Sequence, residues 1–459
     1  MSIVSQTFRA GSQWRKFIKL ATPILIAELL HLSSTVVDTI MAGQYSSTDL
    51  AGVSIGGSTL FPVMIFIVGI LMATTPSVAQ AFGANQKQRI GPLVQQSLWL
   101  AAGISCIGVL ILTQAAQAFN LLDIYGPVRS IALQYVQITA LALPAMAVIQ
   151  SLRSFSEGLS ITKPMMYFGL LGALVNIPLN YMFIYGKFGM PELGGVGCAW
   201  ATLISVWVTV IGMACYVYLR PAYHQYGFFE RLHQPNWQVI KSLLKTGIPI
   251  GISIFIEATM FAIIALFLAP LGPTVVASHQ LVLNFSSLSF MIPLSIGIAL
   301  TIRVGQSIGA QKADEAKTTV IIGFVLALSM SALTCSLMLF LPEYIARIYT
   351  QDQEVIDIAV SLFFLAAMFQ LSDAIQVAAA GTLRGYKDTR WPMMMIVISY
   401  WGIGLPLGYA LGLTDILVPN MGAAGFWIGL IIGLSCAALL LCIRVWRVTH
   451  KPLPKVITN

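Results

Sequence analysis

The chain consists of long apolar segments separated by short polar stretches. A run of about 20 apolar residues is enough to span the hydrocarbon core of a bilayer. Segments of that kind are expected at 17–42, 51–75, 93–118, 131–152, 164–185, 195–219, 243–269, 276–301, 318–341, 358–381, 393–412 and 421–443. The pattern therefore predicts an all-α membrane protein with twelve transmembrane helices.

Composition agrees with this pattern. Hydrophobic residues make up 57% of the 459 residues and charged residues only 9%, far from the balance of an ordinary soluble domain. A soluble protein of this length could not bury so much apolar surface. Lys16 and Lys19 lead into a first segment that is too long for the apolar core of a cleavable signal. We expect that segment to remain as a helix.

The positions of the basic residues indicate the topology. If the N-terminus is cytoplasmic and the loops alternate, only Arg129, Lys187 and Arg347 of the 25 lysines and arginines fall on the outer side. This asymmetry is the positive-inside rule, and it predicts that both termini are cytoplasmic. The net charge of +8 therefore reflects topology and does not indicate a nucleic-acid partner.

No motif of catalysis or of metal binding stands out. The six cysteines are scattered through apolar segments without CxxC spacing, which gives neither a disulfide framework nor a zinc site. The sequence contains no P-loop, GxSxG or HExxH motif. We therefore expect neither an enzyme nor an ATP-driven pump, and no cofactor.

The second half of the chain repeats the first at an offset of 226 or 227 residues. The matching pairs are Lys19 with Lys245, Pro23 with Pro249, Gln80 with Gln306, Gly83 with Gly309, Gly158 with Gly385, Gly195 with Gly422, and Trp200 with Trp427. Each half holds six predicted helices, so both halves enter the membrane from the same side. We predict two parallel six-helix repeats, 1–225 and 226–459, an arrangement found in transporters that work by alternating access.

Carboxylates inside apolar helices are the candidate functional groups, since a charge at the bilayer centre costs about 2.5–3.5 kcal/mol on insertion scales. Asp38 shares a helix face with His31, Ser34 and Thr35, because residues three, four and seven apart lie on one side of a helix. We expect this polar stripe to point into the first bundle. The function of Glu28 is open between a structural ion pair and a transport role, and His31 is equally open.

The fifth predicted helix adds two amides to the same half. In VNIPLN, Asn176 and Asn180 lie four residues apart on one face. The proline between them frees backbone carbonyls, as in broken helices that bind ions at membrane depth. With Asp38 these amides suit a proton or a hard cation. A structural hydrogen-bond network that locks the helices together is the alternative.

The second half carries the acids Glu257 and Asp373. Asp373 lies eleven residues before Arg384, which places it about 16 Å from the inner boundary at 1.5 Å per residue. Both carboxyls are expected near mid-membrane, and no arginine or lysine is expected within their helices to neutralise them. The repeat pairs Glu257 with His31, so the acids are not inherited from the duplication and the two halves have different chemistry.

Several motifs together resemble one family. They are VVDTIMAG at 36–43, the paired Q-x-x-GA loops at 80–84 and 306–310, LRGYKDTRWP at 383–392, and the acids Glu257 and Asp373. This set resembles the multidrug and toxic compound extrusion (MATE) family, in its bacterial NorM-type branch, from about residue 10 to 448.

The resemblance implies a V-shaped twelve-helix exporter. It implies that Asp38, Asn176 and Asn180 form a cation or proton cluster, and that Glu257 and Asp373 are cation-site acids that could hold Na⁺. It also places in the substrate cavity the residues Phe261, Gln280, Asn284 and Phe290. Asn284 departs from relatives with an acid at that position, and Phe290 stands where a tyrosine can occur.

The expected function is secondary active export of organic cationic and aromatic drugs and dyes from the bacterial cytoplasm. The protein would lie in the inner membrane as a monomer, surrounded by lipid, and would use Na⁺ or H⁺ as the coupling ion. The alternative is a flippase for lipid-linked precursors from the same superfamily. A flippase should have a basic cavity for pyrophosphate, whereas the charges expected at mid-membrane here are acidic.

Overall fold

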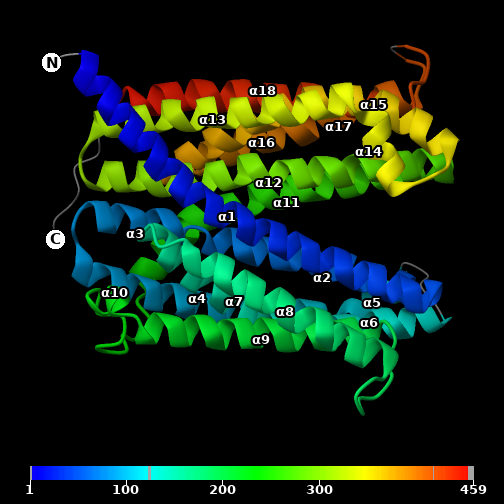
Figure 1. The fold of residues 1–459 in the computed structure, drawn as a ribbon, viewed down its shortest axis with the longest axis horizontal. Helices are drawn as coiled ribbons and strands as arrows, with labels where there is room; N and C mark the ends of the chain where they lie inside the picture. The colour runs from blue at the N-terminus through cyan, green and yellow to red at the C-terminus, as the bar shows by residue number, and fades with distance from the viewer. Residues whose placement is uncertain (1–2, 122–125, 417, 453–459) are drawn as a thin grey trace. The chain divides into compact units, whose positions relative to one another are not determined.

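The computed structural model describes residues 3–121, 126–416 and 418–452, and it is almost entirely helical (Figure 1). Side chains are described from Gln13 onward, with gaps around the loop after residue 121. Lys455 and the side chain of Arg9, which belong to the charge asymmetry predicted above, lie outside the described residues.

Within the described residues, eleven helices are long and apolar enough to cross a membrane. A twelfth span is obtained if Gly126–Ala140 and Leu143–Gly158, which meet at a bend of 43°, count together. This confirms the predicted all-α membrane fold. The segment expected at 131–152 contains that bend, since its helix breaks after Ala140.

The chain folds into two compact units. We call residues 26–251 the N-terminal unit, and residues 1–25 together with 252–459 the C-terminal unit. Two long helices, α1 (Ile3–Tyr45) and α11 (Trp237–Leu268), pass from one unit to the other. The division falls just after Pro23 in α1 and Pro249 in α11, which are equivalent positions in the repeat. These units do not coincide with the halves 1–225 and 226–459, which remain a prediction drawn from the duplication.

The N-terminal unit contains the second part of α1 and the first part of α11. Between them lie α2 (Ser47–Leu71), α3 (Thr74–Gly83), α4 (Lys87–Leu112), α5 (Ala115–Leu121), α6 (Gly126–Ala140), α7 (Leu143–Gly158), α8 (Lys163–Tyr185), α9 (Val196–Leu219) and α10 (Pro221–His224). Helix α2 begins where the side chain of Ser46 accepts a hydrogen bond from the amide of Thr48, at 3.1 Å, an N-cap. Helix α8 ends at Gly186, whose φ of +63° is a left-handed conformation that glycine adopts without strain.

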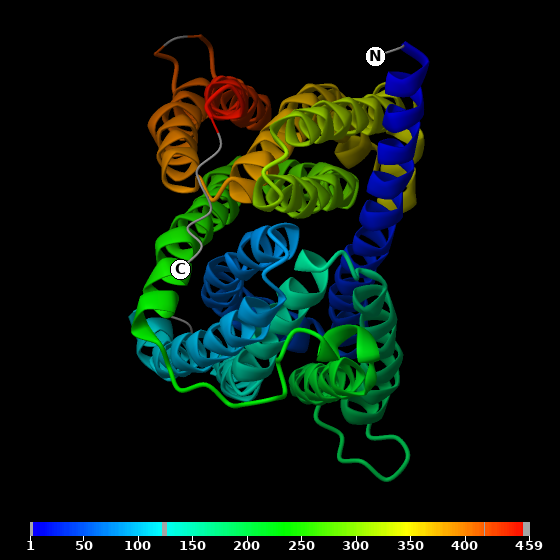
Figure 2. The same cartoon turned by 90° about the vertical axis from the view of Figure 1, so that its left-hand side faces the viewer.

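The C-terminal unit contains the remaining parts of α1 and α11 and all later elements. These are η1 (Ala269–Leu271), α12 (Pro273–Gly309), α13 (Ala313–Phe340), α14 (Pro342–Tyr349), α15 (Gln353–Gly385), α16 (Arg390–Val397), the π-helical turn η2 (Ile398–Gly404), α17 (Leu405–Leu413) and α18 (Ala423–Thr449). Helix α15 packs against α12, α13 and α18, and Figure 2 shows these helices nearly end-on.

The duplication is visible in the backbone of two pairs of turns. Asn85 and Gln311 follow the Q-x-x-GA motifs with φ of 56° and 57°. Each follows an alanine whose φ is −75° and ψ is 1°. Ser160 and Lys387, 227 positions apart, have φ of 62° and 58°. Matching backbone geometry at matching offsets agrees with the predicted duplication at these turns.

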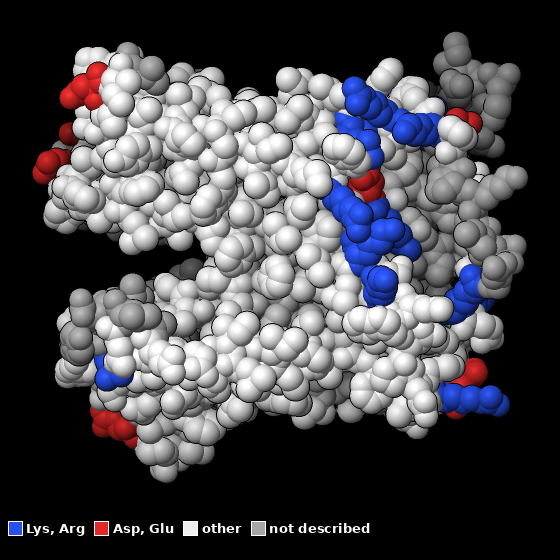
Figure 3. Space-filling model, turned by 180° about the vertical axis from the view of Figure 1, so that it is seen from behind, with Lys and Arg blue, Asp and Glu red and all other residues white. Residues whose placement is uncertain are grey.

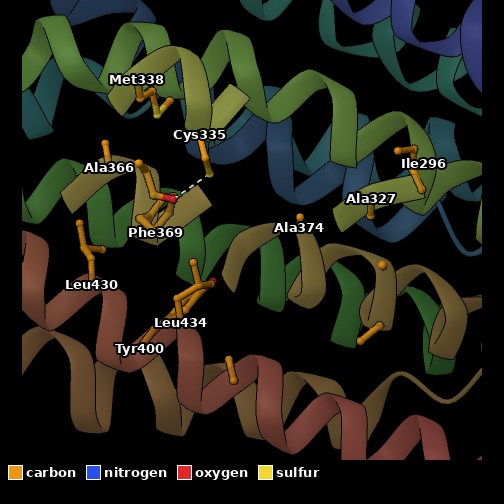
Figure 4. Packing of buried hydrophobic residues seen from close by; sticks show 14 of the residues in the cluster. Ile296, Ala327, Cys335, Met338, Ala366, Phe369, Ala374, Tyr400, Leu430 and Leu434 are labelled. Carbon is orange, nitrogen blue, oxygen red and sulfur yellow. Dashed lines mark hydrogen bonds between the residues drawn. The ribbon is translucent and has the colours of Figure 1, made fainter. Parts of the chain in front are cut away.

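The core of the C-terminal unit surrounds α15. Figure 4 shows Phe369 on this helix, with Leu430 and Leu434 on α18. The thiol of Cys335 on α13 donates to the carbonyl oxygen of Ala367 at 3.0 Å. The Cys335 thiol thus packs inside the core.

Helices α17 and α18 approach each other through glycines. Gly404, the last residue of η2, faces Gly433, and one and two turns further on Gly408 and Gly412 of α17 face Gly429 and Gly425. A Cβ on Gly429 would lie 2.5 Å from the Cα of Gly408. Small residues at this spacing let membrane helices pack backbone to backbone. The contact fixes α17, and with it the π-helical turn that precedes it.

The linker between the halves is held on the N-terminal unit by two glutamines of α4. Gln95 donates to the carbonyl oxygen of Phe228 at 2.6 Å and accepts from the amide of His233 at 2.8 Å. Gln96 accepts from the amide of Asn236 at 2.6 Å. These bonds hold the linker against α4 at Phe228, His233 and Asn236, just before α11 begins.

Charges divide along the helices. In the upper part of Figure 3, lysines and arginines gather at one end of the C-terminal unit and acids stand at the other. In the C-terminal unit, Lys312, Arg390 and Arg447 stand at what we call the basic end. Glu354 and Asp357 stand at the opposite, acidic end. This is the distribution that the positive-inside rule predicts.

Candidate functional site

The carboxylate of Asp38 on α1 lies against two amides of α8. Asn180 donates from Nδ2 to Oδ1 of Asp38 and also to Oδ1 of Asn176, the latter at 3.0 Å. Thr202 on α9 donates to Oδ2 of Asp38 at 3.4 Å. Asn176 and Asn180 are buried. The structure brings together the three residues expected in this half and adds Thr202, which sequence reasoning missed.

The remainder of the polar stripe on α1 behaves differently. His31 and Thr35 are exposed, and the hydroxyl of Thr35 donates back to the carbonyl oxygen of His31 at 3.4 Å. Ser34 likewise bonds to its own helix, at Leu30. The prediction that the stripe points into the bundle is therefore wrong for His31 and Thr35. Hydroxyls one turn along a helix can be satisfied by its own carbonyls, so only Asp38 needs partners on other helices.

No basic side chain is bonded to Asp38 within the part of the chain that the structure describes. Its partners are neutral donors that orient the carboxylate without cancelling its charge. Asn180 retains a buried carbonyl oxygen, Oδ1, without a hydrogen-bond partner among the described residues. The cluster thus offers two acidic oxygens and an unpaired amide oxygen.

In the C-terminal unit, Glu257 on α11 and Asp373 on α15 are close enough to interact electrostatically. Asp373 is 2% exposed, and its Oδ1 has no hydrogen-bond partner among the described side chains and backbone. Phe261, one turn after Glu257, packs edge-on against Phe369, one turn before Asp373, with ring centroids 6.1 Å apart. The expected acid pair therefore exists, with a pair of aromatic rings beside it.

Two further groups act on this acid pair. Tyr400, buried in the π-helical turn η2, is within electrostatic range of both carboxyls. Arg384 interacts with Glu257, so the expectation that no arginine reaches these acids is wrong. Helix α15 continues beyond its apolar segment to Gly385, which places Arg384 inside the same helix as Asp373.

Neutral oxygens supplement the two acids. Gln370 and Gln376 on α15 are buried, and their side-chain oxygens lack hydrogen-bond partners among the described residues. No three His, Cys, Asp or Glu side chains converge on one point within those residues. A cation at Glu257 and Asp373 would therefore need neutral oxygens to complete its coordination, as hard cations accept.

The residues expected in a substrate cavity share one unit but differ in exposure. Gln280 and Asn284 are exposed on one face of α12, one turn apart. Phe261 and Phe290 are partly buried. Exposed amides on a membrane-length helix are costly against lipid, so this face of α12 suits a hydrated surface.

Glu28, left open above, is an ion-paired residue. Arg153 on α7 donates from Nη2 to Glu28 and from Nε to Glu157, the latter at 2.7 Å. Thr75 on α3 donates to the second oxygen of Glu157 at 3.5 Å. This triad, Glu28–Arg153–Glu157, ties α1 to α7 and α3. It differs from Asp38 because its charge is met by a fixed cation.

Comparison with known proteins identifies a matching family and similar full-length proteins. The model of the MatE family matches residues 23–182 and 249–410. The chain is 45% identical over 431 residues to the multidrug resistance protein NorM of Photobacterium profundum, which covers 94% of each chain. It is 43% identical over 449 residues to the multidrug resistance protein PmpM of Pseudomonas aeruginosa, which covers 98% of this chain and 94% of the relative.

A solved structure agrees in fold. The crystal structure of the eukaryotic MATE transporter AtDTX14 superposes with a TM-score of 0.86 at 20% identity, covering 95% of this chain and 96% of the other. The two segments matched by the family model include Asp38, both amides of α8 and both acids of the C-terminal unit. These candidate residues thus lie within the parts of the chain that match the family.

Proposed function

We propose that this chain, which belongs to the MatE family, exports organic cations in exchange for Na⁺ or H⁺. Members of that family are multi-pass membrane transporters and not enzymes. Relatives at 43–45% identity are named multidrug resistance proteins, which supports drugs and dyes as its substrates. We place it in the bacterial inner membrane with both termini cytoplasmic, as a monomer that needs no cofactor.

One observation carries the proposal: Asp38 is held by neutral donors, whereas Glu28 and Glu157 share Arg153. A carboxylate inside a membrane helix needs a positive partner or a proton. The partner of Asp38 is then exchangeable, and a proton or Na⁺ fills this role. The acid pair Glu257 and Asp373, with buried amide oxygens near it on α15, is the second exchangeable site.

In this scheme, binding of the coupling ion neutralises the acids, and the bound organic cation disfavours that ion. The coupling is reciprocal, because each ligand must weaken the other by the same factor. The two repeats supply the alternating access, and the exposed amides Gln280 and Asn284 belong to the hydrated surface over which the substrate passes.

Transport in proteoliposomes tests the proposal. Ethidium efflux is measured under an imposed Na⁺ gradient and then under an imposed pH gradient. Asp38→Asn and Asp373→Asn should each lower efflux under the effective gradient by about 100-fold or more, the size of a lost essential ionisable group. Asp357→Asn, an exposed acid on the same helix as Asp373, should leave efflux unchanged. Wild-type rates in both acid variants would refute the mechanism.

A further inference from the structure

Two touching rings in the C-terminal unit carry polar atoms without partners. His279 on α12 and Trp427 on α18 are both 0% exposed. Their ring centroids lie 5.9 Å apart at an interplanar angle of 67°. Neither ring nitrogen of His279 nor Nε1 of Trp427 has a hydrogen-bond partner among the described residues. Three unpaired nitrogens therefore belong to two contacting rings that are both wholly buried.

Burying a polar nitrogen without a hydrogen-bond partner destabilises the folded protein. Each unsatisfied buried donor or acceptor costs about 1–3 kcal/mol, and native proteins meet this cost with protein groups or bound water. A neutral imidazole presents one donor and one acceptor, and the indole presents a donor. Water can satisfy all three atoms. A hard cation cannot, because two of the three point a hydrogen outward.

These rings lie one aromatic layer away from the acid pair. Trp427 packs edge-on against Phe369 at 5.9 Å, and Phe369 packs against Phe261 at 6.1 Å. Each phenylalanine lies one turn, about 5.4 Å along a helix, from an acid: Phe261 after Glu257 and Phe369 before Asp373.

Helix direction orders these groups along the unit. Helix α15 runs from the acidic end to the basic end, and α11 runs the opposite way. Both phenylalanines therefore stand on the acidic-end side of the acids. His279 is the seventh residue of α12, which starts at the acidic end. From the acidic end, His279 and Trp427 come first, near the starts of α12 and α18, followed by the phenylalanine pair and then the acid pair.

The His279 ring has no electrostatic interaction with a charged side chain among the described residues. Burial is its only electrostatic influence. The charged groups on its own helix and on the helices around it are Arg303 on α12, Lys241, Lys245 and Glu257 on α11, Asp314, Glu315 and Lys317 on α13, Glu343 and Arg347 on α14, Glu354, Asp357, Asp373 and Arg384 on α15, and Arg444 and Arg447 on α18. Protonation of this ring would therefore depend on its access to water.

We propose that His279 and Trp427 bind a small cluster of water that carries protons between the acidic end of the C-terminal unit and the acid pair. The inference rests on the proposed function, in which Glu257 and Asp373 take up the coupling ion, and it makes this route specific for H⁺. His279 accepts a proton from a protonated water at one nitrogen and releases the proton of its other nitrogen to a second water, which becomes protonated in turn. The ring ends neutral and no other bond changes. The contacting rings of Trp427, Phe369 and Phe261 extend from this cluster toward the acid pair.

Hydroxyl-radical footprinting tests the water directly. X-ray radiolysis of bound water oxidises the side chains beside it, so Trp427 should be oxidised in the full-length protein although it is wholly buried. His279→Phe, which keeps a ring and removes both nitrogens, should lower this oxidation several-fold. His450→Phe is the matched control, because His450 also packs on a tryptophan, Trp446, at 5.0 Å, but is exposed. An unoxidised Trp427 in the wild type would overturn the proposal.

Transport separates a proton route from a structural role. In proteoliposomes loaded with tetraphenylphosphonium, His279→Phe should slow pH-driven efflux by about tenfold or more, within the range for a lost proton-transfer group. Any Na⁺-driven efflux should change by less than about twofold, since Na⁺ does not use this route. Equal slowing under both gradients, or unchanged pH-driven efflux, would overturn the inference.

The two proposals can fail separately. If the wild type moves substrate under a Na⁺ gradient alone, the proton route is overturned while the export proposal stands. If neither gradient drives efflux, the export proposal fails, and the footprinting result still decides whether water is bound at His279.

Discussion

Removal of Arg153 should destabilise the protein more than removal of any exposed ion-pair partner. This guanidinium bonds two carboxylates at once, Glu28 and Glu157. The side chain of Glu157 is 3% exposed, that of Glu28 is 14% exposed, and that of Arg153 is 20% exposed. Arg153→Leu therefore leaves two shielded negative charges without their shared cation.

The size of the effect follows from this burial. Breaking a buried pair by removing one partner costs about 3–5 kcal/mol. That range corresponds to a fall of roughly two to four orders of magnitude in the folding equilibrium constant. Replacing all three groups with neutral ones, as in Arg153→Leu with Glu28→Gln and Glu157→Gln, removes the stranded charges. The triple variant should recover most of the loss.

Unfolding in mixed micelles of mild detergent and dodecyl sulfate, followed by circular dichroism, measures these differences. The matched control is Arg347→Leu. Arg347 also pairs with a glutamate four residues away, Glu343, but the two side chains are 44% and 59% exposed. Exposed pairs contribute about 0–1 kcal/mol. The reasoning is refuted if Arg153→Leu costs no more than Arg347→Leu, or if the triple variant is less stable than Arg153→Leu.

Two glycine substitutions test close backbone contacts. Gly91→Ala would put a Cβ 2.4 Å from a carbonyl oxygen of the linker, so trypsin should cut the linker faster than in Gly103→Ala, where a Cβ on the same helix meets nothing within 4 Å. Gly429→Ala should destabilise the protein by about 1–3 kcal/mol in the same micelle assay, as overpacking does. Gly402→Ala, with its nearest neighbour at 3.9 Å, should cost less, and equal costs would contradict the packing between α17 and α18.

Hydropathy predicted the spans because length and apolar character alone decide whether a helix crosses the membrane. It could not place the break after Ala140, because backbone bends leave the apolar composition unchanged. It also ended the tenth span at residue 381, four residues before the helix ends at Gly385. Hydropathy therefore puts Arg384 in a loop, and it does not predict the electrostatic interaction between Arg384 and Glu257.

The candidate sites were predictable where a polar residue interrupts an apolar helix. Asp38, Asn176 and Asn180 are such residues, and one face of α8 brings both amides to the acid. Thr202 and Tyr400 were not predictable in this way, because threonine and tyrosine are common in membrane helices. Their significance depends on which helices are neighbours, and only the structure supplies that.

The passage of α1 and α11 between the units has a consequence for biosynthesis. The N-terminal unit is one continuous stretch, 26–251, and all of its residues are available before residues 252–459 have been made. The C-terminal unit can form only after residues 252–459 have been synthesised. Residues 1–25, which leave the ribosome first, then pack against them. The start of α1, including Phe17 and Ile24, which end up in the core of that unit, therefore has no native partners during most of translation. Assembly of the two units is sequential, and the earliest residues synthesised are among the last to be packed.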